Sequence, residues 1–268
     1  MKFSKKNELI RFPEKPGKHA LAMPAVKGLE PDFFKELTMV QRRILREGSM
    51  LHVKDIYFTY QPGSFSLQIP HFSVGAGEKM AVIGPSGSGK TTLLSLVGGI
   101  LSPDRGTISV NNVELSTLSD TARRNFRIST IGFIFQDFGL LDYLDVRDNI
   151  LHPYRITGTL TLTKDVRDRS ELLAERMGIS DKLTRHPPEL SHGERQRVAI
   201  CRALLTRPKI ILADEATGNL DPKNKLHIMN LLCESVEFED ATLLAVTHDQ
   251  ELLGQFDQVT DFQNWLTG

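Results

Sequence analysis

A glycine-rich stretch that follows an apolar run has the residue types of a phosphate-binding loop. The apolar run covers residues 80–83, and the stretch after it consists of Gly84, Pro85, Ser86, Gly87, Ser88, Gly89, Lys90, Thr91 and Thr92. This matches the P-loop pattern, in which glycines let backbone N–H groups point at phosphate oxygens and the next helix adds its positive end. In this pattern Lys90 reaches the β and γ phosphates, and the Thr91 hydroxyl binds Mg²⁺. The sequence therefore predicts a nucleoside triphosphate site between a strand and a helix.

Two carboxylates follow a second apolar run, which covers residues 210–213. We expect Asp214 to hold Mg²⁺, directly or through water, because a hard cation prefers oxygen ligands. Glu215 is then placed to polarise an attacking water molecule as a general base. An Asp-Glu pair that stands alone after an apolar run is more often a solvated strand end. Beside a P-loop, the functional interpretation is favoured.

A third segment has the residues of a helix start that can also hold an anion. Ser191 can cap the helix, and Glu194 three residues later completes a capping box. Ser191 and Gly193 flank a helix end whose free N–H groups attract anions. The segment is therefore either an ordinary capped helix or a second phosphate-binding element, and the residues alone leave both interpretations open.

Short apolar runs predict the scaffold that positions these groups. Helical stretches separate most of the runs, which lie at 80–83, 131–135, 210–213 and 242–246. Continuous runs of Ile, Val, Leu and Ala are typical of parallel strands that are buried on both faces. Such sheets bind ligands at the carboxyl ends of their strands, and the polar residues described above stand there. Residues 51–60 and 64–70 predict two further strands around a turn at 61–63.

Composition and charge disfavour several classes of protein. The 268 residues are 40% hydrophobic, which suffices for one large domain or two modest ones. The 33 basic and 33 acidic residues cancel, so the net charge gives no reason to expect nucleic acid as the main partner. Only Cys201 and Cys233 occur, which suits core thiols in a reducing compartment. The longest apolar stretches, such as 93–101, fall short of the roughly 20 residues of a membrane helix, and residues 1–10 do not resemble a secretory signal.

Residues 1–50 are expected to form a partly helical extension ahead of the main domain. Lys and Arg outnumber Asp and Glu there by 11 to 6. Asp32 can cap a helix whose apolar positions recur about three and four residues apart, at Phe33, Phe34, Leu37, Val40, Ile44 and Leu45. This helix either packs on the main domain or contacts a partner or anionic lipid headgroups. A third alternative is that the natural start is Met50, directly before the strand pattern.

The order of the motifs resembles that of the ATP-binding cassette (ABC) ATPases over about residues 51–262. Gln136 follows the run 131–135, the capped helix precedes the Asp-Glu strand, Asn219-Leu220-Asp221 comes after it, and His248 follows residues 243–247. The resemblance is strongest to cassettes of the lipoprotein-release and macrolide-export type. It implies an α/β fold, a P-loop NTPase with a mainly parallel sheet core, an antiparallel β subdomain and an inserted helical subdomain at about 137–190. The ABC ATPase domain would cover residues 51–268.

The resemblance also implies roles for residues around the nucleotide. Tyr60 would stack on adenine, although an aromatic packed in the core is an equally good interpretation of that residue. Gln136 would touch Mg²⁺ or the attacking water, and His248 would contact the γ-phosphate and orient Glu215. The implied reaction is hydrolysis of ATP to ADP and phosphate, with Glu215, His248, Gln136 and Lys90 as catalytic residues.

Family members pair head to tail, which implies roles for residues far from the P-loop. Ser191 and Gly193 of one subunit would close on the ATP held by the other, and Asp221 would lie across the dimer interface. Two residues depart from the family pattern. His192 stands where the family usually has the first of two glycines, and the resemblance implies that its side chain crowds the approach to the γ-phosphate. Ala216 replaces the usual proline, and we expect the effect of this change to be mild.

The implied function is to energise a membrane ABC transport or mechanotransmission complex. The partners would be a second cassette, as a homodimer in the ATP-bound state, and an integral-membrane permease that holds the chain at the cytoplasmic face of the cell membrane. A permease helix would dock beside the helical subdomain, where four residues either line the groove or belong to the core: Leu140, Leu141, Tyr143 and Leu144. The alternative is a soluble ABC clamp that acts on nucleic acid, ribosomes or cofactor-assembly partners. A nucleoside-type kinase shares the P-loop but does not explain residues 191–196 or His248.

Overall fold

The computed structural model describes residues 48–61, 65–218 and 222–265 of the chain. The helix expected within residues 32–45, the turn residues 62 and 63, and the segment Asn219-Leu220-Asp221 lie outside the described residues. Residues 46–268 form one compact unit, in which two sheets are present. Within the described part of the chain, no helix combines the length and the apolarity needed to cross a membrane.

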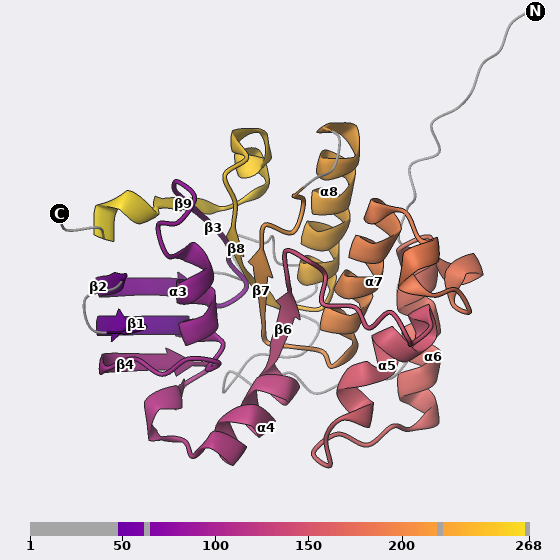
Figure 1. The fold of residues 1–268 in the computed structure, drawn as a ribbon, viewed down its shortest axis with the longest axis horizontal. Helices are drawn as coiled ribbons and strands as arrows, with labels where there is room; N and C mark the ends of the chain where they lie inside the picture. Colours follow the sequence, from indigo (N-terminus) through magenta and orange to yellow (C-terminus); the bar gives the residue numbers. More distant parts are fainter. Residues whose placement is uncertain (1–47, 62–64, 219–221, 266–268) are drawn as a thin grey trace, which may run out of the picture. The chain divides into compact units, whose positions relative to one another are not determined.

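The four apolar runs of the sequence form neighbouring strands of one parallel sheet (Figure 1). A fifth strand at the edge completes the order β6-β7-β8-β3-β9, and all four pairings are parallel. The bounds are β3 Lys79–Ile83, β6 Ile131–Ile134, β7 Ile210–Asp214, β8 Thr242–Val246 and β9 Gln258–Asp261. Because the strands run in one direction, the residues that follow them meet at one edge of the sheet. The predicted α/β fold with a mainly parallel core is confirmed.

A smaller antiparallel sheet has the order β2-β1-β4-β5. Its strands are β1 Ser49–Thr59, β2 Ser66–Gly75, β4 Arg105–Val110 and β5 Val113–Glu114. The strands expected at 51–60 and 64–70 are therefore present, and the second extends to Gly75. Strands β4 and β5 were not predicted from the sequence, because most of their residues are only partly buried and give a weak apolar alternation.

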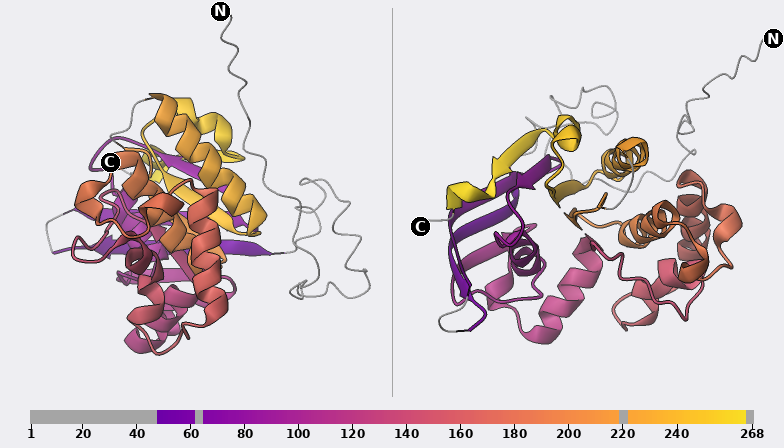
Figure 2. Two further views of the ribbon diagram at one scale, coloured as in Figure 1. Left: turned by 90° about the vertical axis from the view of Figure 1, so that its right-hand side faces the viewer. Right: turned by 45° about the horizontal axis from the view of Figure 1, so that its top comes forward.

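Helices cover both faces of the parallel sheet. The bounds of the α-helices are α3 Lys90–Val97, α4 Asp120–Thr130, α5 Val146–Arg155, α6 Lys164–Arg176, α7 His192–Leu205 and α8 Pro222–Phe238. Short 3-10 helices are η1 Leu115–Thr117, η2 Ser180–Lys182, η3 Pro187–Glu189, η4 Gln250–Gln255 and η5 Phe262–Trp265. Figure 1 and Figure 2 show α3 between the two sheets and α7 and α8 on the opposite face of the parallel sheet. The chain between β6 and α7 contributes α5 and α6 and no strand.

Two buried apolar clusters lie on opposite faces of the parallel sheet. Along β7, Ile210 and Leu212 belong to the cluster that contains α3 and the antiparallel sheet, whereas Ile211 and Ala213 belong to the cluster that contains α7 and α8. Successive side chains of a strand point to opposite faces, so a strand covered on both sides must be apolar at every position. This explains why the central strands appear in the sequence as continuous apolar runs. The two cysteines, expected to be core thiols, are both buried.

Candidate functional site

A cavity of about 380 Å³ lies at the carboxyl end of the parallel sheet. It is bounded by residues that follow β1, β3, β6 and β7 and are far apart in the sequence. The lining residues are Tyr60, Phe65, Ser86, Gly87, Gly89, Lys90, Thr91, Thr92, Gln136, Asp214 and Glu215. The structure therefore brings the P-loop, the Asp-Glu pair, Gln136 and Tyr60 to one place. Gly84, Pro85 and Ser88 belong to the same loop but do not line the cavity.

Gly89 allows the loop to turn directly into α3. It is the N-cap residue of that helix, and its φ of 107° lies in the left-handed region. A Cβ atom at this position would lie 2.5 Å from Cζ of Phe65 and 3.4 Å from Cζ of Phe262. Both the backbone conformation and the packed rings therefore require a residue without a side chain.

Lys90 is held inside the loop at the first position of α3. Its side chain is buried, and Nζ donates hydrogen bonds to the carbonyl oxygens of Gly84, at 2.9 Å, and Pro85, at 2.7 Å. The Ser88 hydroxyl is also buried and has no hydrogen-bond partner within the described residues. Buried polar groups usually have a partner, and the first N–H groups of a helix lack one within the helix. The loop therefore has unused hydrogen-bonding capacity where the sequence predicts phosphate.

Asp214 is a buried carboxylate at the end of β7. It accepts a hydrogen bond from the side chain of Thr91. Burial is the largest influence on the pKa of Asp214 and raises it above its usual value. The hydrogen bond from Thr91 and the charge of Lys90 lower the pKa, whereas the charge of Glu215 raises it further. The exposed side chain of Gln136 lines the same cavity. The oxygen atoms of Thr91, Gln136 and Asp214 are therefore available around one space.

Glu215 and His248 are brought into contact by neighbouring parallel strands. Asp214 is paired with Val246, so the residues that follow β7 and β8 leave the sheet side by side. Nδ1 of His248 lies 3.0 Å from Oε1 of Glu215. Glu215 has a φ of 43°, an uncommon conformation for a residue with a side chain, and its N–H donates to the carbonyl of Val246. Backbone strain of this kind is often concentrated at functional sites.

Two aromatic side chains stand at the edge of the cavity. Tyr60 is 55% exposed, so the alternative in which it packs in the core is wrong. Its hydroxyl lies 3.0 Å from Oγ1 of Thr92, and its ring is 6.4 Å from the ring of Phe65. Phe65 was not predicted as a site residue from the sequence. The available signal was an aromatic residue shortly after the turn predicted at 61–63.

Ser191 and Gly193 do not line this cavity. Ser191 is the N-cap of α7, and it forms the predicted capping box with Glu194. The ring of His192 packs edge-on against Phe138, with 4.7 Å between ring centroids. His192 is therefore accommodated by the segment after Gln136 within the same chain. Asp221, the remaining expected site residue, lies outside the described residues.

The comparisons with known proteins agree on one family. A family model described as ABC transporter matches residues 67–218. The chain is 37% identical to the lipoprotein-releasing system ATP-binding protein LolD of Nitrobacter winogradskyi over 222 residues, which cover 82% of this chain and 95% of that protein. LolD of Acinetobacter baylyi is 36% identical over 220 residues, which cover 81% and 96% of the two chains.

Solved structures of similar proteins are also ABC cassettes. The dimeric post-hydrolysis structure of the cassette MJ0796, bound to ADP and Pi, has a TM-score of 0.71 at 31% identity and covers 79% of this chain and 94% of its own. CbiO1 from Clostridium perfringens, part of the ABC transporter complex cbiONQ, has a TM-score of 0.71 at 30% identity and covers 80% of this chain and 85% of its own. These proteins are named as parts of transport or release systems, which does not favour a soluble clamp on nucleic acid or ribosomes. The chain therefore belongs to the ABC transporter family, as an ATP-binding and ATP-hydrolysing subunit of a membrane transport complex.

Proposed function

We propose that Glu215 is the general base that activates water for attack on ATP bound at the P-loop. The observation that carries this proposal is the 3.0 Å contact between Glu215 and Nδ1 of His248, at the rim of a cavity that Lys90 also lines. Phosphoryl transfer to water requires mainly positioning and charge neutralisation from the protein. Glu215 accepts the proton of the water, His248 orients the carboxylate, and Lys90 with the N-terminus of α3 stabilises the phosphates.

A Mg²⁺ ion fits the atoms that the cavity offers. We assign Thr91, Gln136 and Asp214 as its ligands, Asp214 either directly or through water. All three offer oxygen atoms, which a hard cation prefers. Burial raises the pKa of Asp214, so the surrounding protein groups do not fully stabilise the charged carboxylate. A bound cation would stabilise that charge. When bound, the ion neutralises charge on the β and γ phosphates.

The remaining lining residues are assigned to the rest of the nucleotide. Tyr60 presents an exposed ring beside the loop and would stack on adenine. The backbone of residues 84–92 would surround the phosphates, with Ser86, Gly87 and Thr92 at the cavity surface. The unpaired Ser88 hydroxyl supports this assignment, because a phosphate oxygen would give it a partner.

We propose that two copies pair head to tail when ATP is bound. Ser191 and Gly193 stand at a helix start away from the cavity of their own chain, so they would complete the site of the other copy. Asp221 would lie across this interface. The similar cassette MJ0796 forms a dimer with ADP and Pi bound, which supports the arrangement.

The membrane partner is proposed to be an integral-membrane permease at the cytoplasmic face. The curated relatives are ATP-binding proteins of lipoprotein-releasing systems. We therefore propose that the chain powers a complex of that kind, and that its cycle of dimer closure and hydrolysis moves the attached membrane subunits.

Replacing the proposed base tests this mechanism. Glu215→Gln keeps the side-chain size but cannot accept the proton, so we expect turnover at least about 100-fold slower, as for loss of general base catalysis. ATP should then hold the variant as a dimer that elutes early in size-exclusion chromatography. Glu175→Gln, an exposed change on α6, serves as the matched control. Unchanged turnover in Glu215→Gln would show that another group is the base.

A further inference from the structure

The ring of His248 receives little support from packing around it. Its side chain is 63% exposed, and Nδ1 lies 3.0 Å from Oε1 of Glu215. A largely exposed side chain can change rotamer unless its backbone and its neighbours restrict it. The position of the imidazole therefore depends on Thr247 and Asp249, the two residues that flank His248 in the chain.

Thr247, on one side of His248, is fixed to the parallel sheet. The residue is buried, and its N–H donates to the carbonyl oxygen of Val82 in β3 at 3.1 Å. The Thr247 hydroxyl accepts a hydrogen bond from the N–H of Asp249 at 3.0 Å. Thr247 therefore anchors the chain before His248 and also holds the backbone of the residue after it.

Asp249, on the other side of His248, uses both of its carboxylate oxygens. Oδ1 accepts from the N–H of Glu251 at 3.1 Å, which makes Asp249 the N-cap of η4. Oδ2 accepts from Nζ of Lys225 at 2.7 Å, in an ion pair whose side chains are only 24% exposed for Lys225 and 15% for Asp249. The hydrogen bond from Lys225 is the largest of the influences that lower the pKa of Asp249 below its usual value. Lys225 therefore holds an ionised carboxylate directly beside His248.

Lys225 lies near the start of α8, and this helix is packed on the parallel sheet. Ile228 and Leu232 of α8 belong to the same buried cluster as Leu243 and Ala245 of β8. The ion pair thus joins the loop after β8 to a helix that the core already holds in place. A single ion pair near the surface adds little stability, so we expect its main effect to be on the orientation of Asp249.

We propose that Lys225 is a positioning residue for ATP hydrolysis: by holding Asp249, it keeps the His248 ring directed at Glu215. The proposal rests on the proposed function, in which His248 orients the general base Glu215. Without Lys225, the Asp249 carboxylate would lose the partner of Oδ2 and could turn toward the ring beside it. It would then compete with Glu215 for the imidazole, because the charges of Asp249 and His248 interact. Lys225 does not line the nucleotide cavity, so its loss should leave nucleotide binding unchanged.

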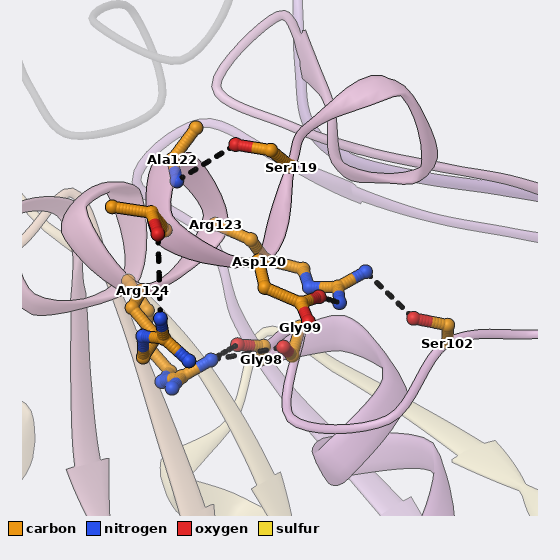
Figure 3. A network of polar contacts seen from close by, with 10 residues as sticks. Gly98, Gly99, Ser102, Ser119, Asp120, Ala122, Arg123 and Arg124 are labelled. Carbon is orange, nitrogen blue, oxygen red and sulfur yellow. Dashed lines mark hydrogen bonds and ion pairs between the residues drawn. The ribbon is translucent and has the colours of Figure 1, made fainter.

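The test compares ATP hydrolysis by purified full-length chains at one protein concentration with excess Mg²⁺. Lys225→Met removes the charge and keeps an unbranched side chain, whereas Lys225→Arg keeps the charge. The matched control is Arg123→Met, which breaks an ion pair on α4, outside the lining of the nucleotide cavity. Figure 3 shows that Arg123 pairs with Asp120 and donates to Ser102. For each form kcat, KM and the affinity for Mg·ADP are measured, with the melting temperature as a check of folding.

We expect Lys225→Met to lower kcat by about tenfold, because a small displacement of a catalytic group slows a reaction by that much or more. KM and the affinity for Mg·ADP should stay within about twofold of the wild type, since a loss in kcat alone identifies an interaction that acts on the transition state. Lys225→Arg should keep kcat within about threefold of the wild type, because it retains a cation at this position. Arg123→Met should leave kcat unchanged.

A double-mutant cycle with His248 shows whether Lys225 acts through that residue. His248→Ala alone should lower kcat by about 100-fold, and adding Lys225→Met should lower it by less than about twofold more. A further tenfold loss in the double variant would overturn the proposal, because Lys225 would then act by another route.

The outcomes separate this proposal from the proposed function. Unchanged kcat in His248→Ala would overturn the role of His248 under the proposed function, and this inference with it. A loss of kcat in His248→Ala but not in Lys225→Met would overturn the role of Lys225 alone. A loss in Lys225→Met that Arg123→Met or Lys225→Arg reproduces in full would also refute that role, because the effect would not follow the charge at residue 225.

Discussion

Gly89→Ala should destabilise the protein mainly through a contact with one ring, and this can be separated from backbone strain. The new Cβ would stand 2.5 Å from Cζ of Phe65, about 1 Å closer than the van der Waals contact of two carbon atoms. Such overpacking typically costs about 1–3 kcal/mol of unfolding free energy. The left-handed φ of 107° adds about 1–2 kcal/mol for a residue with a Cβ. The total expected loss is therefore about 2–5 kcal/mol.

Gly87→Ala supplies the control for the backbone contribution. Gly87 has a φ of 78°, and a Cβ there would meet nothing within 4 Å. Its substitution should therefore cost only the strain, about 1–2 kcal/mol. In a Phe65→Ala background the ring is gone, so Gly89→Ala should also fall to about that value. Phe65→Ala alone should cost about 1–2 kcal/mol, because Phe65 is only partly buried.

The assay is equilibrium unfolding in urea without nucleotide, on the wild type, the three single variants and the Gly89→Ala/Phe65→Ala double variant. The double-mutant cycle isolates the interaction between residues 89 and 65, which should be about 1–3 kcal/mol. Equal costs of Gly89→Ala in the two backgrounds would refute the argument that Phe65 packs over the loop. A cost of Gly87→Ala as large as that of Gly89→Ala would show that backbone strain dominates.

Two further predictions concern buried polar groups. A carboxyl whose pKa is raised by burial binds protons more tightly in the folded state, so it disfavours folding above its unfolded pKa, and this penalty disappears as the pH falls. Asp214→Asn should therefore raise the melting temperature of the nucleotide-free protein at neutral pH while removing Mg²⁺-dependent ATP hydrolysis. A variant that melts below the wild type at pH 7 and above it at pH 4 would contradict the expected direction of the effect. Asn149 is fully buried, accepts from the N–H of Leu141 and donates to the carbonyls of Leu141, Leu144 and Asp145. Asn149→Ala should cost about 2–4 kcal/mol in urea unfolding, because it leaves several backbone groups of this loop unpaired, and a loss below about 0.5 kcal/mol would show that water replaces the side chain.

The sequence predicted those parts of the fold that depend on local pattern. The strands β3, β6, β7 and β8 are buried on both faces, so their apolar runs were unambiguous. β4 is only partly buried, and its alternation was too weak to identify. The capping box of Ser191 and Glu194 involves residues three apart in the chain, and it was also predicted correctly.

Features that depend on tertiary packing were not predicted. Phe65 lies against Gly89 in the folded chain, and no spacing in the sequence expresses that contact. Arg124 and Arg127 look, in sequence, like the solvated face of a helix. In the structure they line one side of a cavity of about 450 Å³, because α4 lies opposite residues of α5 and α7. The four residues 140, 141, 143 and 144, which the sequence left between a groove and the core, do not line this cavity.

Strand register connects the sequence to the chemistry of the site. In the parallel pairing of β7 and β8, Asp214 is opposite Val246, so the next residues of both strands leave the sheet at the same level. The N–H of Glu215, which follows β7, donates to the carbonyl oxygen of Val246 in β8. The N–H of Thr247, which follows β8, donates to the carbonyl oxygen of Val82 in β3. These two hydrogen bonds continue the contacts of β8 with β7 and β3 past the ends of the strands. A shift of one residue would turn Asp214 to the other face of the sheet, away from Thr91, and would separate Glu215 from His248. The apolar residues of β7 and β8 therefore do more than stabilise the core: by fixing the register, they determine that a carboxylate, a hydroxyl and an imidazole meet at one edge.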